Sequence, residues 1–452
     1  MVKILTILAI LAAGFFAISA PYIAALLYTT VSILQPQYIW FWVFDDISIF
    51  RISAGIAIIA WLIHMLRGGI NWQMYNNGIF FGLLGLLALY YLSNAFTPFP
   101  SYGSRIGSEL VMGIFTTIVI MFFIVLGLIN HEKALKLLVV CVVIVTLYYT
   151  YWANSAYLEG NWSQFTRGRL NGPRGSPYKD GNIFSVLFVV GLPFVLFAVG
   201  QVEKTWQKAL LILAIPLIWH AMILCASRGA LLSAAVSTLL AARMIKSKSF
   251  NMVLLAGALV FLIDQGGEML SRTVSTVKKA ETEANEPINP RVISWQIAFD
   301  LAKKHPVLGV GPQRFLEASR FYFPGKSPHV AHNTFLNYAA NLGFIAAFIY
   351  LMFFWVSWKM YKWNRDALEA HPDKLHTYIN KASFCSLVGF FVGATFLDLI
   401  IFEPFYFLLI IIIANNFILK QKVSANEALA ADGKKQEEAG HEPLANAGST
   451  GV

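Results

Sequence analysis

The sequence NPRVISWQIAFDLAKKHPVLGVG (residues 289–311) lies inside a polar interval that runs from Gln265 to His332. The chain leaves an apolar segment at Leu262–Ile263 before this interval and enters another at Phe335–Leu336 after it. It is the longest polar run in a chain that is 57% hydrophobic, which indicates that the fold is organised around it. We expect the interval to cap a reaction site at a membrane surface.

The composition is typical of a helical membrane protein. Charged residues make up 13% of the 452 residues, against about a quarter in soluble proteins, and the mean hydropathy is +0.62. Many apolar runs approach the length of about 20 residues that crosses the hydrocarbon core. The net charge of +10 indicates basic cytoplasmic loops and anionic lipid or phosphate partners. No nucleic-acid partner is indicated, because no basic cluster alternates with aromatic residues on a soluble segment.

The three cysteines, Cys141, Cys225 and Cys385, lie within or beside apolar runs and predict small buried side chains. Their spacing fits neither a metal site nor a disulfide framework. The sequence therefore predicts no metal and no other cofactor.

Apolar runs predict the membrane-spanning helices. The first 34 residues, interrupted by Pro21, form either a tight hairpin or one broken element. Further spans are expected at 49–66, 79–92, 110–129, 135–151, 183–199, 209–226, 231–244, 252–263, 333–358, 383–397 and 402–419.

Basic residues in alternate short loops orient the chain. Lys133, Lys204, Arg243, Lys359 and Lys420 then lie on the cytoplasmic side, and the long interval lies outside. This gives about 12 crossings with both ends inside, or 13 with the N-terminus outside. We predict an all-α polytopic membrane protein with four regions: an N-terminal bundle (1–264), a periplasmic loop with an amphipathic helix (265–331), C-terminal transmembrane helices (332–419) and a disordered cytoplasmic tail (420–452).

The outer loop Ala153–Gly181 breaks this charge pattern. Its basic residues outnumber its acidic ones and are Arg167, Arg169, Arg174 and Lys179. Because basic residues are disfavoured on this side, binding of an anionic ligand explains them best. The turn Gly172–Ser176 could bring backbone amides near a phosphate, although a plain connecting turn is the favoured interpretation.

Two arginines at span boundaries are candidate phosphate ligands. Arg228, in Ser227-Arg228-Gly229-Ala230, lies between two apolar runs on the outer side, where a planar guanidinium can pair two phosphate oxygens. The alternative is an arginine that extends to the membrane interface. Arg291 follows Asn289-Pro290, an expected helix start whose backbone donors also favour anions. Taken alone, Arg291 is better explained as a solvated residue. Val292, Trp295, Phe299 and Ala302 define the expected apolar face of that helix.

His332 directly precedes the span expected at 333–358 and is followed by Asn333. Histidine is the usual proton acceptor near neutral pH, so His332 is the candidate base, and His329 competes with it. An interfacial histidine bonded to the backbone is the alternative. Asp398 and Glu403 flank a short outer turn, where they either line a cavity or mark the membrane interface.

In order and spacing these segments resemble the O-antigen ligase/polymerase superfamily of bacterial envelope enzymes. The resemblance rests on Ser227–Leu232, on Arg291 and Trp295 leading into Pro306-Val307-Leu308-Gly309-Val310-Gly311, and on His332-Asn333-Thr334 followed by Gly343-Phe344. It extends to about Leu419, and the N-terminal third is similar to the branch of O-glycosylation ligases.

The resemblance implies a GT-C-type glycosyltransferase in the bacterial inner membrane whose active site faces the periplasm. Its donor would be a glycan on undecaprenyl diphosphate and its acceptor the lipid A–core of lipopolysaccharide, with membrane lipids around both. Arg228 and Arg291 would hold the diphosphate with help from Arg174 and Lys179, and His332 would activate the acceptor hydroxyl. His329, Asn333 and Arg169 are supporting candidates. The expected reaction is inverting and metal-independent.

One residue departs from the pattern, because many relatives carry an acidic side chain near the position of Asn341. Three alternatives also stay open at this stage. The protein could be a polysaccharide polymerase or a protein O-glycosylation ligase, which would share the donor site, or a lipid-linked glycan transporter. A transporter predicts charges deep in several spans and an inverted repeat, and neither is evident.

Overall fold

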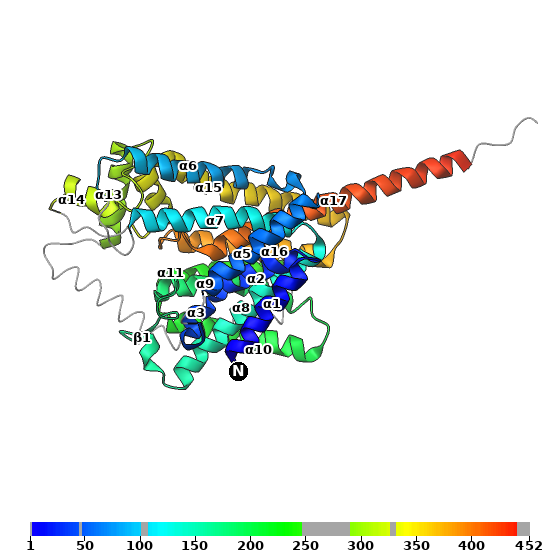
Figure 1. Cartoon of the computed structure of the whole chain (residues 1–452), viewed down its shortest axis with the longest axis horizontal. Coiled ribbons are helices and arrows are strands. Elements are labelled where there is room, and N and C mark those ends of the chain that lie inside the picture. The colour runs from blue at the N-terminus through cyan, green and yellow to red at the C-terminus, as the bar shows by residue number, and fades with distance from the viewer. Residues whose placement is uncertain (1, 45–47, 101–106, 246–289, 326–330, 441–452) are drawn as a thin grey trace, which may run out of the picture.

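The computed structural model describes residues 2–44, 48–100, 107–245, 290–325 and 331–440. In this part of the chain eight helices are long and apolar enough to cross a membrane. They lie side by side in one bundle (Figure 1), so the prediction of a polytopic helical membrane protein is confirmed. The number of crossings, 12 or 13, stays a prediction, and the expected span 252–263 lies outside the described residues.

The long helices of the bundle are α5 (Ile49–Leu66), α6 (Gly78–Phe96), α7 (Ser108–Leu128), α8 (Glu132–Leu158), α9 (Gly181–Ala198), α10 (Thr205–Leu224), α11 (Arg228–Met244), α15 (Thr334–Ala370), α16 (Lys374–Ala394) and α17 (Glu403–Gly440). The shorter elements are α1 (Val2–Ala17), α2 (Tyr22–Leu34), α3 (Pro36–Ile39), α4 (Phe41–Phe44), η1 (Trp72–Tyr75), η2 (Trp162–Gln164), α13 (Pro290–Lys304) and α14 (Phe315–Tyr322). A two-stranded antiparallel hairpin, β1 (Phe165–Thr166) and β2 (Arg169–Leu170), is the exception to the all-α prediction.

The first 34 residues form a hairpin rather than one broken element. Helix α1 ends at Ala17, the chain turns through Pro21, and α2 returns against α1. Ile10 and Val31, which lie at similar distances from the turn, belong to one apolar cluster. Proline fits this turn because it lacks the N–H that a continuous helix would need.

Helices α9, α11 and α16 pack closely through small residues. Gly389 of α16 has no room for a side chain, since an added Cβ would lie 2.9 Å from Val189 and 3.0 Å from Ser237. The Ser237 hydroxyl donates to the Cys385 carbonyl at 2.9 Å, and Ser386 donates to the Val190 carbonyl at 2.7 Å. Small residues and interhelical hydrogen bonds drive association in lipid, where apolar burial gives little.

Helix α15 is broken at Gly343, and the segment Pro306–Gly311 fills the break. Gly343 has φ 86° and ψ 172°, so its neighbours cannot continue the helical hydrogen bonds. The N–H of Phe344 donates instead to the Pro306 carbonyl at 2.8 Å. The N–H groups of Val310 and Gly311 donate to the freed carbonyls of Ala340 and Asn341, each at 2.9 Å. An unpaired backbone group at membrane depth costs several kcal/mol, so these three bonds permit the break.

Hydroxyl groups at the ends of α6 and α7 hold the segment after α13 against the bundle. Ser93 Oγ lies 2.6 Å from the Leu308 carbonyl oxygen and 3.1 Å from that of Asn341. Thr97 donates to the Val310 carbonyl at 2.5 Å, and Ser108 donates to the Pro312 carbonyl at 2.6 Å. The Pro306–Pro312 segment, and with it the end of α13, is therefore held at one end of the bundle.

The region after Leu419 differs from the prediction of a disordered tail. Helix α17 continues without a break to Gly440 and projects from the bundle (Figure 1), so residues 420–440 are helical. Alanine, glutamate and lysine, which made the tail look disordered by composition, are also the strongest helix formers. Residues 441–452 lie outside the described residues.

The substitution Gly309→Ala tests the close fit between the Pro306–Gly311 segment and the broken helix α15. Gly309 has φ 65°, and an added Cβ would lie 2.3 Å from the Asn341 carbonyl carbon. We expect Gly309→Ala to lower stability by about 2–5 kcal/mol, from left-handed strain and overpacking together. Thermal unfolding in detergent measures this. Gly55→Ala is the control, because nothing lies within 4 Å of its Cβ position. Equal melting temperatures for the two variants would contradict the proposed fit.

Candidate active site

Arg228 is the first residue of α11 and is exposed at the α10–α11 turn. Ser227 caps the helix, with its hydroxyl oxygen accepting from the Ala230 N–H at 3.5 Å. Ala226, directly before the cap, has a left-handed backbone with φ 49°. This sharp turn separates α10 from α11, as the sequence predicts. Arg228 therefore lies beside the first backbone N–H groups of α11.

Arg291 lies in the first turn of α13, which begins at Pro290 as predicted. Asn289, its expected cap, lies outside the described residues. The predicted apolar face was partly wrong, because Val292 and Phe299 are 37% and 43% exposed. The side chains that α13 buries against the bundle are Ser294, Ile297, Ala298, Leu301 and Ala302. Small residues at 294 and 298 allow this closer approach, which apolarity alone does not predict.

Arg169, at the start of β2, is fixed against the turn that carries Arg228. Its Nε donates to the Cys225 carbonyl at 3.2 Å, and its Nη2 donates to Asn182 Oδ1 at 2.7 Å. Cys225 is three residues before Arg228. The outer basic loop and the α10–α11 turn therefore present their guanidinium groups in one place.

Three guanidinium groups, those of Arg169, Arg228 and Arg291, form the arginine cluster. Burial lowers the pKa of Arg291, and the positive charges of Arg228 and Arg169 lower it further. Such repulsion acts only between charges close enough to escape full screening by water and salt. The cluster gathers like charges from β2, α11 and α13, an arrangement that an anion would stabilise.

His332 is exposed and precedes α15 with a left-handed φ of 46°. Asn333 caps the helix by accepting the Leu336 N–H at 2.9 Å, and its Nδ2 donates to the Thr395 carbonyl at 3.0 Å. The position of His332 is thus set by a neighbour that is bonded on both sides. His329, the competing base, lies outside the described residues.

The turn at Thr395–Phe396, between α16 and α17, brings the starts of three helices together. A Cβ on Gly229, next to Arg228, would lie 3.1 Å from Phe396 Cβ. The ring of Trp295, one helical turn after Arg291, lies 6.4 Å from the Phe396 ring. Asn333, next to His332, bonds to Thr395. The starts of α11, α13 and α15 therefore meet at one end of the bundle (Figure 1).

Other candidates of the outer loop are placed differently. Arg174 donates to the Ser163 carbonyl at 2.7 Å within its own loop, and Lys179 is exposed. In the Gly172–Lys179 turn, the N–H of Gly172 donates to Tyr178, that of Tyr178 to Ser176 Oγ, and that of Lys179 to the Ser176 carbonyl. These amides are already used, which favours a connecting turn over a phosphate cradle. Glu403 accepts a hydrogen bond from Ser32 inside the bundle.

Asn341, where many relatives are acidic, has a structural role here. Its Oδ1 accepts the Phe315 N–H at 3.1 Å, and its Nδ2 donates to the Asn337 carbonyl at 3.1 Å. The side chain thus links the start of α14 to α15. A carboxylate could accept from Phe315 but could not donate to Asn337 unless protonated.

Sequence reasoning missed two residues that hold the site together. Phe396 carries no polar group, and only the structure shows that it joins α11 and α13. Arg314 is 6% exposed and donates from Nη1 to Asn94 Oδ1 at 2.8 Å, which braces the loop beside Gly311. Its position three residues after a Gly-x-Gly segment was the one signal available.

Comparison with known protein families gives two matches along the chain. Residues 209–351 match a family model described as O-Antigen ligase. Residues 1–203 match a family of unknown function (DUF5935), and the chain matches no curated protein. The region that matches the O-antigen ligase model contains Arg228, Arg291 and His332, and the N-terminal match contains Arg169. The predicted resemblance to the O-antigen ligase/polymerase superfamily is confirmed.

Arg228→Gln tests whether the three arginines of the arginine cluster repel one another. Because the variant removes one of three like charges, we expect the melting temperature of the ligand-free protein at low salt to stay equal or rise slightly. The difference should vanish in 1 M salt, where charges are screened over about 3 Å. Arg320→Gln, at an exposed arginine on α14, is the control. A larger fall for Arg228→Gln than for the control at both salt concentrations would contradict the cluster.

Proposed function

We propose that this protein is an O-antigen ligase that transfers a glycan from undecaprenyl diphosphate to the lipid A–core of lipopolysaccharide. The transfer takes place at the periplasmic face of the bacterial inner membrane, by an inverting and metal-independent reaction. The observation that carries the proposal is the convergence of Arg169, Arg228 and Arg291 at one end of the bundle. His332 lies at the same end, directly before the residue that caps α15.

The arginine cluster suits a diphosphate leaving group. Cleavage of the sugar–phosphate bond places a new negative charge on the terminal phosphate. Guanidinium groups fixed in advance stabilise a developing charge without reorganisation, and each can pair two oxygens. Arg169 is held by two hydrogen bonds, and Arg291 belongs to a helix packed on the bundle. Three such charges can balance a diphosphate without a metal.

The acceptor side of the reaction needs a base, and His332 takes this role. Its neutral imidazole removes the proton from the acceptor hydroxyl as the oxygen attacks the anomeric carbon. The bond from that carbon to the phosphate oxygen breaks, and its electron pair stays on the diphosphate. A single displacement from the face opposite the leaving group inverts the anomeric configuration. Asn333 positions His332 by fixing the start of α15 to Thr395.

His332→Ala tests the proposed base in a transfer assay. Purified protein receives undecaprenyl-diphosphate glycan and rough lipopolysaccharide. We expect glycosylated lipid A–core from the native protein and a rate about 10²–10⁴-fold lower from the variant, the usual contribution of a general base. Arg320→Gln again serves as the control.

The product of this assay also separates the alternatives. Longer glycans that remain on undecaprenyl diphosphate would make the protein a polysaccharide polymerase. Transfer to an added protein acceptor alone would make it a protein O-glycosylation ligase. A folded protein that transfers to none of these acceptors would overturn the proposal in favour of transport of a lipid-linked glycan.

The same assay in EDTA tests the source of charge stabilisation. Since arginines rather than a divalent cation balance the leaving group, we expect full activity at a temperature where the protein is stable. NMR of the product linkage should show an inverted anomeric centre. Activity abolished by EDTA and restored by Mg²⁺, or a retained configuration, would contradict this mechanism.

A further inference from the structure

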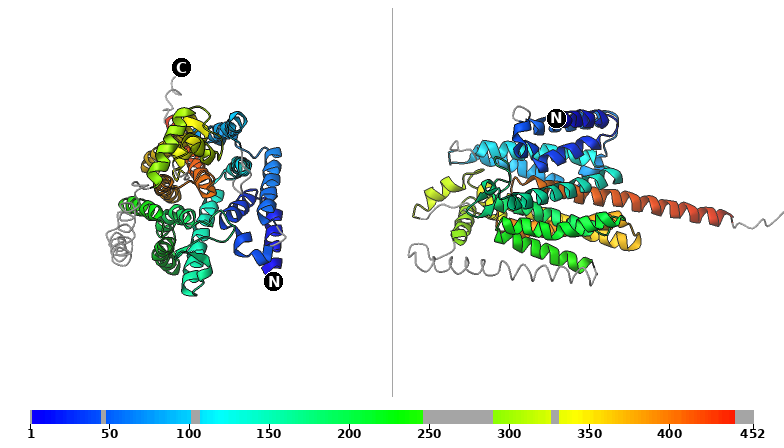
Figure 2. Two further views of the ribbon diagram at one scale, coloured as in Figure 1. Left: turned by 90° about the vertical axis from the view of Figure 1, so that its left-hand side faces the viewer. Right: turned by 90° about the horizontal axis from the view of Figure 1, so that it is seen from below.

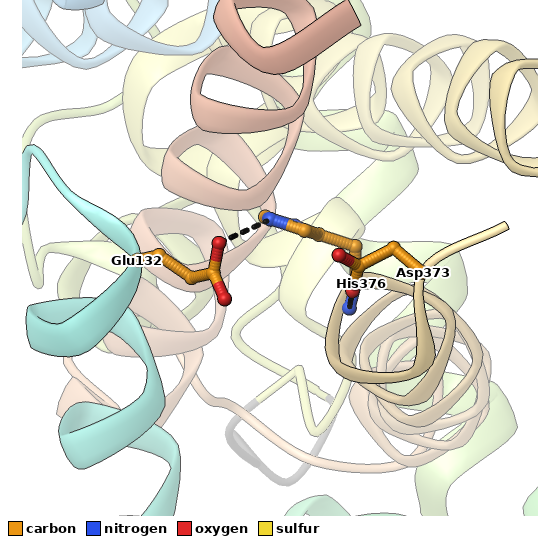
Figure 3. Close-up of side chains that lie close together, drawn as sticks. All are labelled: Glu132, Asp373 and His376. Carbon is orange, nitrogen blue, oxygen red and sulfur yellow. Dashed lines mark hydrogen bonds and ion pairs between the residues drawn. The ribbon is translucent and has the colours of Figure 1, made fainter. Parts of the chain in front are cut away.

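A second cluster of polar groups lies at the opposite end of the bundle from the arginines. Helix α7 starts at Ser108, which bonds to Pro312 near the candidate active site, and ends at Leu128. Its 21 residues span about 30 Å. Just beyond that end lie Glu132, the first residue of α8, and Asp373 and His376 at the start of α16 (Figure 3). This is the end predicted to face the cytoplasm.

His376 is fully buried, and one of its ring nitrogens is directed at this cluster. Nδ1 lies 2.8 Å from Asn415 Oδ1, an acceptor that favours the tautomer with the proton on Nδ1, in which Nε2 presents its lone pair. Nε2 has no hydrogen bond partner among the described residues and lies 3.8 Å from Glu132 Oε2 (Figure 3). In that tautomer, a buried lone pair that faces a carboxylate is unfavourable unless a proton or a metal cation lies between them.

The carboxylates already attract a cation from the protein itself. Lys422 of α17 places Nζ 3.1 Å from Glu132 Oε2 and 2.7 Å from Asp373 Oδ2. Its side chain is 41% exposed, so it can withdraw into water. Lys422 donates to the two carboxylates, whereas Nε2 of His376 accepts no hydrogen bond among the described residues. A metal ion would satisfy all three groups together.

We propose that Glu132, Asp373 and His376 form a binding site for a divalent transition metal such as Zn²⁺, which displaces the Lys422 ammonium. Their ligand atoms lie within 4.8 Å of one another. Zn²⁺ holds nitrogen and carboxylate ligands at about 2.0–2.2 Å, so bound ligand atoms lie roughly 3.4 Å apart. The two carboxylates are partly exposed and can rotate to close that difference.

The donor set and its support fit this class of metal. One imidazole with two carboxylates suits Zn²⁺ or a similar ion, whereas Mg²⁺ prefers oxygen ligands and retained waters. Metal-bound histidines almost always donate their other N–H to an oxygen, as His376 does to Asn415. Bound metal would join the ends of α8 and α16 and release Lys422 on the projecting helix α17.

The test measures Zn²⁺ binding to the full chain in detergent by equilibrium dialysis. Lys422→Met removes the competing ammonium, so we expect its Kd for Zn²⁺ to be at least ten-fold lower than that of the native protein. Adding Glu132→Gln or Asp373→Asn to Lys422→Met should weaken binding at least ten-fold. Co²⁺ bound to Lys422→Met should show the visible absorption of a low-coordinate site with a nitrogen ligand. Glu369→Gln in the same background, at an exposed acid near the end of α15, is the matched control.

Two results would overturn the site. Equal Zn²⁺ affinity in Lys422→Met and in its Glu132→Gln derivative would place the metal elsewhere. An affinity no higher in Lys422→Met than in the native protein would leave Lys422 as the permanent cation of an ion-pair network. Neither result bears on glycosyl transfer, because the cluster lies at the other end of the bundle from the arginines.

Discussion

The structure depends on how the backbone is satisfied where α15 breaks. A helix inside a membrane cannot leave its carbonyl groups unpaired, and the break at Gly343 frees those of Ala340 and Asn341. The Pro306–Gly311 segment supplies the missing donors, and Gly309 allows the two backbones to touch. Because α13 leads directly into this segment, the same bonds fix the helix that carries Arg291. The start of α15, with His332, lies on the other side of the break.

The candidate active site is built from arrangements that cost stability. Ala226 and His332 both hold left-handed backbones directly before a capped helix, at about 1–2 kcal/mol each. The arginine cluster adds repulsion among like charges. Such strain persists where the surrounding structure enforces it and is concentrated at functional sites. A bound diphosphate would relieve the repulsion, so the like charges that cost stability also favour binding of an anion.

The sequence predicts the helical membrane architecture well, and the chemical roles of its site residues stay predictions. Hydropathy places α5 and α7 closely, and Arg228, Arg291 and His332 all lie in the region that matches the O-antigen ligase model. Local patterns do not reveal which face of α13 is buried, because that depends on close approach through Ser294 and Ala298. They also miss Phe396 and the cluster around His376, since both arise from contacts between segments distant in the chain. The helix in 420–440 was missed because its composition fits disorder and helix equally.

The most direct measurement of the central claim is the affinity of the purified protein for undecaprenyl diphosphate, determined by calorimetry in detergent. The account predicts that Arg291→Gln and Arg169→Gln each bind this lipid at least ten-fold more weakly than the native protein. Arg320→Gln should bind it with native affinity, and undecaprenyl monophosphate should bind less tightly than the diphosphate. Equal affinities in all four proteins would show that the arginine cluster does not hold the diphosphate and would contradict the account.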